Sequence, residues 1–242
     1  MSSDLPWAPA PARVVLTPDD VHVWRVRLDP PDDQVAALAA LLSADERRRA
    51  ARLRAAARQR RFVVAHGLVR TILARYLGAA PADLRFDHGV NGKPALAGAP
   101  LRFNLSHSYE LALVGVTQGR ELGIDIERVR DTVAIAPLAA RFFSAAERAL
   151  LQALPDGERR AGFFRLWTRK EAYLKATGEG VSRELRAIDV TAAPEAGAAA
   201  VRVHGVVDAR FTVHALGPDP AYVAALVVEG SDARVSGWRW SA

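Results

Sequence analysis

Two stretches of this 242-residue chain repeat each other at a separation of 101 residues. Leu42-Ser-Ala-Asp-Glu46 and Phe143-Ser-Ala-Ala-Glu147 each have the pattern of a capping box, in which a serine hydroxyl and a glutamate carboxylate bind free amides at the start of a helix. A long helical pattern follows each box and ends at Gly78 or at Gly178. Since the repeat covers about half of the chain, it restricts the fold to two similar halves.

The similarity extends beyond the boxes into helices and strands. The matched positions are Phe62 with Phe163, Leu84 with Leu185, and Phe103…Tyr109-Glu-Leu-Ala-Leu-Val114 with Phe211…Tyr222-Val-Ala-Ala-Leu-Val227. We therefore predict an α+β fold in which a pseudo-twofold axis relates two halves, residues 1–118 and 119–242, each with a long helix packed on a small antiparallel sheet. The cleft between such halves is the natural active site. The alternative is chance similarity between helices rich in alanine and leucine.

Hydrophobic periodicity predicts the order of the elements. Strands are expected at residues 21–28, 84–86, 103–106, 111–116 and 122–127, and helices at 32–42, after Ser43, at 57–77, after Ser144 and from 163 to 178. The segment before residue 21 is expected to be mobile. A turn at Gln118-Gly119 predicts that the strands on either side of it form a hairpin, and Val90-Asn-Gly-Lys-Pro94 predicts a tight loop.

Charge and composition restrict the partners and the location. The net charge is +6, from 33 basic and 27 acidic residues, which favours an acidic partner such as nucleic acid, a phosphorylated small molecule or an acidic protein. The chain has no cysteine, so any metal is held by carboxylates or histidines. No apolar run reaches the roughly 18 residues of a membrane span, and the first residues lack a signal-peptide pattern. We expect a soluble, cytoplasmic protein that does not enter a membrane.

Lysine is rare in this arginine-rich chain. Only three lysines occur, Lys93, Lys170 and Lys175. A lysine kept in such a composition indicates a position that needs a compact point charge rather than a planar guanidinium. The arginines of 47–54 and 58–61 are either solvated helix faces or bidentate phosphate ligands.

Three carboxylates are candidates for a metal site. Side chains alternate along a strand, so Asp125 and Glu127 leave the same face of the predicted strand 122–127. Glu171 lies on the long helix, one turn from Trp167 and one turn from Lys175. Carboxylates that share a face repel each other, and a hard cation such as Mg²⁺ relieves the repulsion. The alternatives are an exposed acidic strand face and an ordinary surface pair of Glu171 with Lys175.

Polar residues at the end of the strand 103–106 are candidate phosphate ligands. Ser106 and His107 offer donors suited to phosphate, although a lone histidine is often structural. The two side chains point to opposite faces of a strand and no G-x-S-x-G pattern occurs, so no hydrolase triad is predicted. Gly92-Lys93-Pro94 lacks the spacing of a P-loop.

Taken together, five motifs resemble those of one enzyme family. They are Asn91-Gly-Lys-Pro-Ala-Leu96, Phe103-Asn-Leu-Ser-His-Ser108, Gly123-Ile-Asp-Ile-Glu127, Arg141-Phe-Phe-Ser…Glu147 and Trp167-Thr-Arg-Lys-Glu-Ala-Tyr-Leu-Lys175. In order and spacing they are similar to the motifs of the Sfp-type 4′-phosphopantetheinyl transferases. The resemblance extends from about Ser43 to Val228.

The resemblance implies transfer of 4′-phosphopantetheine from coenzyme A to a serine of an apo acyl or peptidyl carrier protein, with release of adenosine 3′,5′-bisphosphate. It implies Mg²⁺ held in the C-terminal half by Asp125, Glu127 and Glu171. Glu171, or a water that it polarises, takes the serine proton, and Lys175 steadies Glu171 and the phosphates. The catalytic residues are thus expected to be Glu171, Lys175 and Asp125.

The resemblance also implies contacts with the nucleotide of coenzyme A, mostly from the N-terminal half. Ser106, His107 and Lys175 contact phosphates, Gly92-Lys93-Pro94 lies against the adenine and its neighbouring phosphate, and the 3′-phosphate lies near Arg49 and Arg61. His66 stands where relatives have arginine. We expect a monomer that binds no nucleic acid. The alternative from another class is a non-catalytic phosphate- or nucleic-acid-binding protein.

The segment after Glu127 is the predicted docking site of the carrier. Its cations are Arg128, Arg130 and Arg141, and its apolar side chains are Val129, Val133, Ile135 and Phe142. Apolar residues within a charged rim suit a protein interface. The alternative is that these apolar residues only anchor the linker to the core.

Overall fold

Two five-stranded sheets form the centre of the molecule. The computed structural model describes residues 5–11, 13–89, 92–179, 185–191 and 199–241. The first sheet has the order β1 (Trp7–Pro9), β12 (Arg234–Arg239), β2 (Asp20–Arg27), β6 (Leu111–Gln118) and β5 (Leu101–Ser108). The second has the order β7 (Leu122–Arg128), β11 (Tyr222–Glu229), β10 (Val206–Leu216), β9 (Ala199–Val203) and β8 (Ile188–Asp189). A small separate sheet pairs β3 (Phe86–His88) with β4 (Pro94–Leu96).

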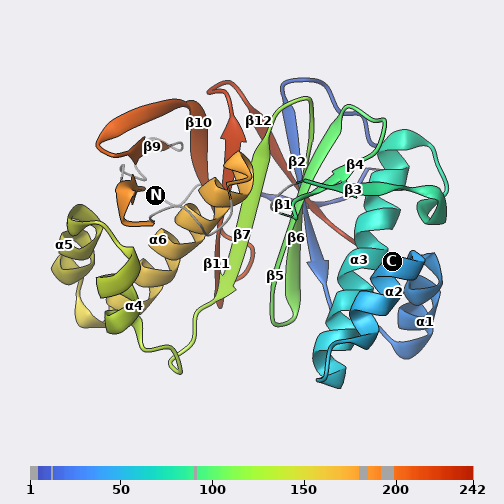
Figure 1. Ribbon diagram of the computed structural model, residues 1–242, viewed down its shortest axis with the longest axis horizontal. Coiled ribbons are helices and arrows are strands. Elements are labelled where there is room, and N and C mark those ends of the chain that lie inside the picture. The colour runs from blue at the N-terminus through green and yellow to red at the C-terminus, as the bar shows by residue number, and fades with distance from the viewer. Residues whose placement is uncertain (1–4, 12, 90–91, 180–184, 192–198, 242) are drawn as a thin grey trace.

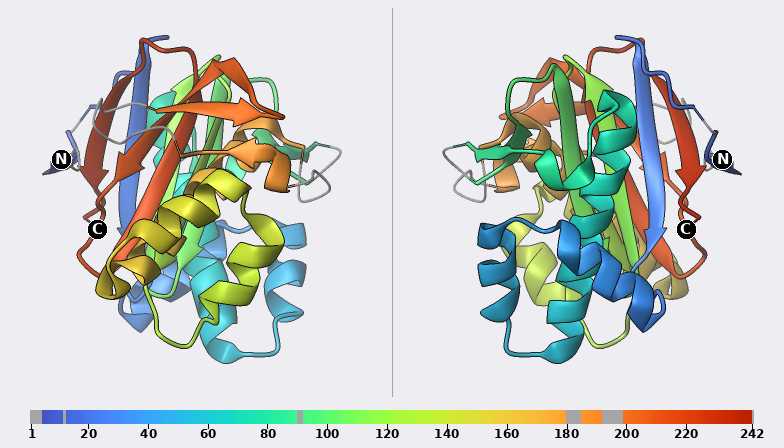
Figure 2. Two further views of the ribbon diagram at one scale, coloured as in Figure 1. Left: turned by 90° about the vertical axis from the view of Figure 1, so that its left-hand side faces the viewer. Right: turned by 90° about the vertical axis from the view of Figure 1, so that its right-hand side faces the viewer.

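Helices cover the outer face of each large sheet (Figure 1). One side carries α1 (Asp32–Leu41), α2 (Ala44–Ala51) and α3 (Ala56–Leu77), and the other carries α4 (Ile135–Phe142), α5 (Ala145–Ala153) and α6 (Asp156–Thr177). Short 3₁₀ turns follow the long helices, η1 at Pro81–Asp83 and η3 at Leu185–Ala187. Figure 2 shows both helical groups from their own sides. No helix in the described part of the chain is long and apolar enough to span a bilayer.

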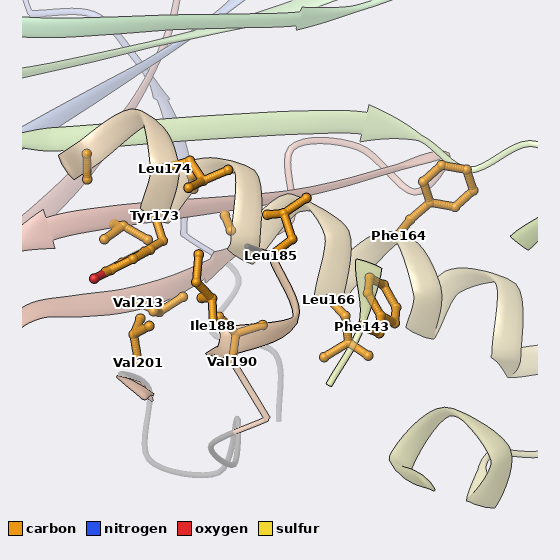
Figure 3. Close-up of a cluster of buried hydrophobic side chains, with 14 of the residues drawn as sticks. Phe143, Phe164, Leu166, Tyr173, Leu174, Leu185, Ile188, Val190, Val201 and Val213 are labelled. Atoms are coloured by element: carbon orange, nitrogen blue, oxygen red, sulfur yellow. The ribbon is translucent and has the colours of Figure 1, made fainter. Parts of the chain in front are cut away.

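Three apolar cores hold these layers together. The core under α3 includes Val64, Leu68, Ile72, Trp24 and Val114, and the core between the sheets includes Val23, Leu113, Ile124 and Leu226. The core under α6 contains Phe143, Phe164, Leu166, Tyr173, Leu174, Leu185, Ile188, Val190, Val201 and Val213 (Figure 3). Burial at about 25 cal/mol per Å² of apolar surface makes these clusters the main stabilising contribution to the fold.

The predicted repeat of local structure is present. Both capping boxes form, with Ser43 and Ser144 accepting from the Glu46 and Glu147 amides at 3.2 and 3.1 Å. The two long helices each have 22 residues and each ends at a glycine with positive φ. The strand order β2-β6-β5 of the first sheet recurs as β7-β11-β10 in the second. β12 departs from this scheme, because it comes from the C-terminal range yet pairs with β2.

Three details differ from the expectations. The hairpin at Gln118-Gly119 is wrong: β6 pairs with β2 and β5, whereas β7 begins a new sheet beside β11. The segment before residue 21 is not simply mobile, because β1 pairs in parallel with β12. The strand expected at 84–86 begins at Phe86, since the 3₁₀ turn precedes it. In the predicted tight loop, Val90 and Asn91 lie outside the described residues, and the Gly92 amide donates to Gly89 O at 2.8 Å.

Candidate active site

Close contact between α6 and β7 creates the centre of the site. A Cβ atom at Gly123 would lie 2.1 Å from Ala172 O and 2.3 Å from Ala176 N, so only glycine lets the helix approach the strand this far. Gly123 belongs to one of the five motifs, but the motif does not reveal this role. The approach brings the carboxylates of β7 to the helix face that carries Glu171 and Lys175.

Asp125 is the centre of a short hydrogen-bond network. Its side chain is buried, and Oδ1 accepts from Lys175 Nζ at 2.7 Å and from Ser106 Oγ at 2.8 Å. Lys175 Nζ also donates to Ser106 Oγ at 3.0 Å and to Ile124 O at 3.1 Å. The structure therefore brings together three of the predicted site residues. In this structure Ser106 donates a hydrogen bond to Asp125, whereas its predicted partner was a phosphate.

Glu127 and Glu171 are two further carboxylates of this region. Burial raises the pKa of Glu127, and the charge of Asp125 raises it further against the hydrogen bond from Ser108. Burial likewise raises the pKa of Glu171, with Asp125 and Glu127 adding to the effect and Lys175 opposing it. The negative charge of Asp125 thus raises the pKa of both glutamates, and a cation would relieve this repulsion.

One buried oxygen fits a metal ligand. Asp125 Oδ2 is buried, and no hydrogen-bond partner for it occurs among the described residues. A buried carboxylate oxygen without a donor is unfavourable unless a cation reaches it, and carboxylate oxygens are the ligands that Mg²⁺ prefers. However, the described residues contain no group of three histidine or acidic side chains that is placed to hold a metal ion. Assignment of Asp125, Glu127 and Glu171 as a ligand set stays a prediction.

A cavity of about 660 Å³ lies in the N-terminal part of the molecule. Elements α2, α3, β3, β4 and β5 contribute its lining, which includes the predicted ligands Arg49, Gly92 and Pro94 together with Phe62 and His66. The rings of Phe62 and His66 are stacked, with their centroids 3.9 Å apart. Size and mixed lining suit a nucleotide-sized ligand.

A buried ion pair borders this cavity. Glu46 accepts from Arg70 Nε at 2.8 Å and lies 3.4 Å from His66 Nδ1. Burial alone would raise the pKa of Glu46, but hydrogen bonds from His66, Arg70 and the Ser43 amide lower it to about 2. Arg70 also donates to Pro81 O and Leu84 O, each at 3.0 Å. The capping box thus fixes the cavity wall as well as the helix start, which the sequence alone did not reveal.

His107 lies on the opposite face of β5 from Ser106, as predicted. Ser106 is buried, whereas part of the His107 ring is exposed. Burial of the rest lowers the pKa of His107, and the nearby cationic groups His66, Lys175 and Arg61 lower it further. His107 is therefore within the electrostatic influence of Lys175 and Arg61, two predicted phosphate ligands, and their positive charge favours an anionic ligand.

Two predicted nucleotide ligands have other partners. Lys93 Nζ donates to Glu121 Oε2 at 2.7 Å, Leu122 O at 3.1 Å and Ala176 O at 3.2 Å, which uses all three ammonium protons. It borders a second cavity of about 470 Å³ with Pro94 and Arg102. Arg61 pairs with Glu110 at 3.2 Å and lies over the Tyr109 ring, and the 660 Å³ cavity is lined by other residues.

The segment after Glu127 packs onto the core. Val129, Val133, Ile135 and Phe142 all lie against the core under α6. Arg160 donates to Arg130 O at 3.0 Å and to Val133 O at 2.9 Å. These contacts agree with the anchoring alternative. Arg128 and Arg130 lie over the Tyr109 ring, at 5.0 and 5.5 Å from its centroid. Arg130 also lies 3.9 Å from Glu127 Oε2, so this part of the charged rim is next to the site.

Comparisons with known proteins agree with the motifs. A model described as the 4′-phosphopantetheinyl transferase superfamily matches residues 121–227. The chain is 41% identical over 238 residues to 4′-phosphopantetheinyl transferase HetI of Nostoc sp. (strain PCC 7120), which covers 97% of this chain and 98% of the relative. It is 33% identical over 212 residues to 4′-phosphopantetheinyl transferase psf-1 of Bacillus pumilus, covering 85% and 89%.

A solved structure is also similar. It is the holo-[acyl-carrier-protein] synthase of Thermotoga maritima, with a TM-score of 0.37 and 23% identity over 46% of this chain and 63% of that one.

Proposed function

Since this chain belongs to the 4′-phosphopantetheinyl transferase superfamily, we propose that it transfers the 4′-phosphopantetheine group of coenzyme A to a serine of an apo acyl or peptidyl carrier protein. The observation that carries the proposal is the network of Asp125, Lys175 and Ser106 beside Glu127 and Glu171. The comparisons give no support to a non-catalytic phosphate- or nucleic-acid-binding protein.

In the transfer, the serine oxygen of the carrier forms a bond to the β-phosphorus of coenzyme A, and the bond from that phosphorus to the bridging oxygen breaks. Adenosine 3′,5′-bisphosphate leaves with the bonding electron pair. The serine proton goes to Glu171 or to a water that Glu171 orients. The raised pKa of Glu171 suits this role, since a base is most effective when its pKa lies close to the working pH.

Asp125, Glu127 and Glu171 are the residues that would hold Mg²⁺, with Asp125 Oδ2 as the best-supported ligand atom. When bound, Mg²⁺ supplies positive charge to the pyrophosphate and stabilises the charge that develops on the leaving phosphate. Lys175 holds Asp125 by its hydrogen bond to Oδ1, which leaves Oδ2 to face the ligand. Lys175 adds positive charge beside Asp125, whereas His107, whose pKa is lowered, would donate a ring N–H to a phosphate as a neutral group.

The 660 Å³ cavity is the proposed site of the nucleotide. Arg49 and His66 are the lining residues suited to the 3′-phosphate, and Gly92 and Pro94 are suited to the flat face of adenine. The recurrence of strand order supports a pseudo-twofold relation between the halves, with the active site where they meet. We further propose a cytoplasmic monomer that meets its carrier through the arginine rim around Tyr109.

One experiment tests the function. The protein is incubated with coenzyme A, Mg²⁺ and an apo carrier protein, and the carrier is analysed by intact-mass and peptide mass spectrometry. We expect the mass of phosphopantetheine on a single serine, and none when Glu171→Gln replaces the wild type. An unmodified carrier after incubation with several apo acyl and peptidyl carriers would contradict the proposal.

A further inference from the structure

The two sheets meet along β5 and β7, which are not paired by their backbones. β7 pairs with β11 and ends the second sheet, and β5 pairs with β6 and ends the first. The other edge of β7 therefore presents amides that need acceptors, and buried amides without acceptors cost free energy. This edge lies in the interior, because Ile124 and Ile126 are almost fully buried.

Side chains of β5 supply the missing acceptors. Asn104 Oδ1 accepts from the Ile124 amide at 2.9 Å. Ser106 Oγ accepts from the Ile126 amide at 3.4 Å, and Ser108 Oγ accepts from the Arg128 amide at 3.2 Å. Every second residue of β5 thus binds every second amide of β7, which follows from the two-residue period of both strands.

The two serines also bind the candidate metal ligands. Ser106 Oγ donates to Asp125 Oδ1 and Ser108 Oγ donates to Glu127 Oε2, both at 2.8 Å. A hydroxyl has one proton to donate and two lone pairs to accept, so each serine can hold an amide and a carboxylate at once. Ser106 thus binds the carboxylate of Asp125 and the backbone amide of the next residue, Ile126. Ser108 binds Glu127 and the amide of Arg128 in the same way.

We propose that Asn104, Ser106 and Ser108 form a side-chain ladder that replaces strand pairing between the sheets and positions the carboxylates of β7. Ser108 is the positioning residue for Glu127, and Asn104 fixes the register of the ladder at its other end. The part that concerns metal binding rests on the proposed function. Partners of this kind fix the orientation of metal-binding carboxylates, and their loss weakens metal affinity.

Ser108→Ala tests the ladder with a small change, because β7 keeps its pairing with β11. Thr117→Val is a matched control, since it removes another buried hydroxyl, which donates to Arg120 O at 2.6 Å near the start of β7. Two readouts are used without carrier or coenzyme A: hydrogen exchange of single amides by NMR, and Mn²⁺ affinity by calorimetry. A third is the Mg²⁺ concentration that gives half-maximal transfer.

For Ser108→Ala we expect the Arg128 amide to exchange roughly tenfold faster, as for the loss of one hydrogen bond. Mn²⁺ binding should weaken about tenfold, with a matching rise in the Mg²⁺ requirement. Thr117→Val should change neither quantity, whatever it costs in stability. If Arg128 exchange and Mn²⁺ affinity are the same in Ser108→Ala as in the wild type, the ladder does not position Glu127 and the inference is wrong.

The outcomes separate this inference from the proposed function. A wild-type protein that binds Mn²⁺ and shows the expected exchange changes, but modifies no carrier, contradicts the function and keeps the ladder. A wild-type protein that does not bind Mn²⁺ overturns the metal part of the inference. Transfer activity that persists with unchanged Mn²⁺ affinity in Ser108→Ala overturns the positioning role while the function stands.

Discussion

The two copies of the capping box are built alike and end in different surroundings. In the first, Glu46 binds Arg70 of α3, and Arg70 binds the carbonyls of Pro81 and Leu84. In the second, Glu147 binds Lys170 of α6 at 2.7 Å, and Lys170 binds the carbonyls of Leu185 and Ile188. In both, a cation on the long helix ties the capping box to the turn that follows that helix.

The copies differ in what covers the carboxylate. Glu46 faces His66 and the 660 Å³ cavity, whereas Glu147 is completely buried and accepts from the Val190 amide at 3.0 Å. We call the first copy open, because Glu46 lines a cavity that a ligand could enter. We call the second copy closed, because Glu147 is buried and is bound to Lys170 of α6. On α6, Lys170 binds within this support, and the next residue, Glu171, belongs to the proposed active site. One repeated scaffold thus borders the proposed nucleotide site in one half and supports α6 in the other.

The largest expected effect is on the closed copy. Lys170→Met leaves the carboxylate of Glu147 buried without its cation, so we expect a loss of about 3–5 kcal/mol in the free energy of unfolding. Arg70→Met is the matched change in the open copy, and we expect a smaller loss because water can enter the cavity beside Glu46. Urea denaturation measures both. Equal losses, or a greater loss for Arg70→Met, would remove the distinction between open and closed copies.

The second effect concerns the pH dependence of stability. The pKa of Glu46 lies at about 2 in the folded protein against 4.5, so its stabilisation, on the order of 3 kcal/mol, is present above pH 4.5 and is lost as the pH falls toward 2. Burial raises the pKa of Glu147, so its contribution is greatest below pH 4.5 and declines as the pH rises through the folded value. The free energy of unfolding is measured between pH 2 and 8 for the wild type, Glu46→Gln and Glu147→Gln. The difference between wild type and Glu46→Gln should rise with pH, and the difference between wild type and Glu147→Gln should fall with pH. Slopes of the same sign would contradict the comparison.

The third effect is catalytic. Glu171→Gln and Asp125→Asn should each lower kcat at least about a hundredfold, because each removes a charge at the reacting centre while it preserves shape. Burial raises the pKa of Glu171, so its stabilisation is lost as the pH rises, and Glu171→Gln should be as stable as the wild type or more stable at neutral pH. Near-normal turnover of either variant at limiting Mg²⁺ would show that the metal assignment is wrong.

The smallest effect is on the open copy and its ligand. Arg49→Ala should weaken coenzyme A binding about tenfold and dephospho-coenzyme A binding much less, because Arg49 lines the cavity. Arg61→Ala is the control, since Arg61 also pairs with a carboxylate, Glu110, but is not among the residues that line the cavity. Calorimetry with both ligands measures the differences. If the wild type binds both ligands equally, neither arginine serves the 3′-phosphate.

Local signals in the sequence predicted much of this structure. Ser43, Ser144, Gly78 and Gly178 mark helix ends through contacts within one turn, and those contacts are visible in the sequence. The alternation around Asp125 correctly placed two carboxylates on one face. These predictions succeeded because they depend on neighbours along the chain.

Contacts between distant segments could not be predicted in the same way. The hairpin prediction failed because both edges of β6 are paired, with β2 and with β5, and the free amides of β7 donate instead to the side chains of Asn104, Ser106 and Ser108. Polar residues at every second position of 104–108 were a signal for this, although their partners were not visible. Likewise, the point-charge roles of Lys93 and Lys170 depend on carbonyls that only the fold brings near.

The most direct measurement is a crystal structure with coenzyme A and Mn²⁺, in which anomalous scattering locates the metal. An open first copy and a closed second copy predict the nucleotide in the cavity beside Arg49 and His66, with Mn²⁺ bound to Asp125 Oδ2. They also predict that the pair of Glu147 and Lys170 does not move. A nucleotide bound beside Glu147, or a metal away from Asp125, would contradict the account.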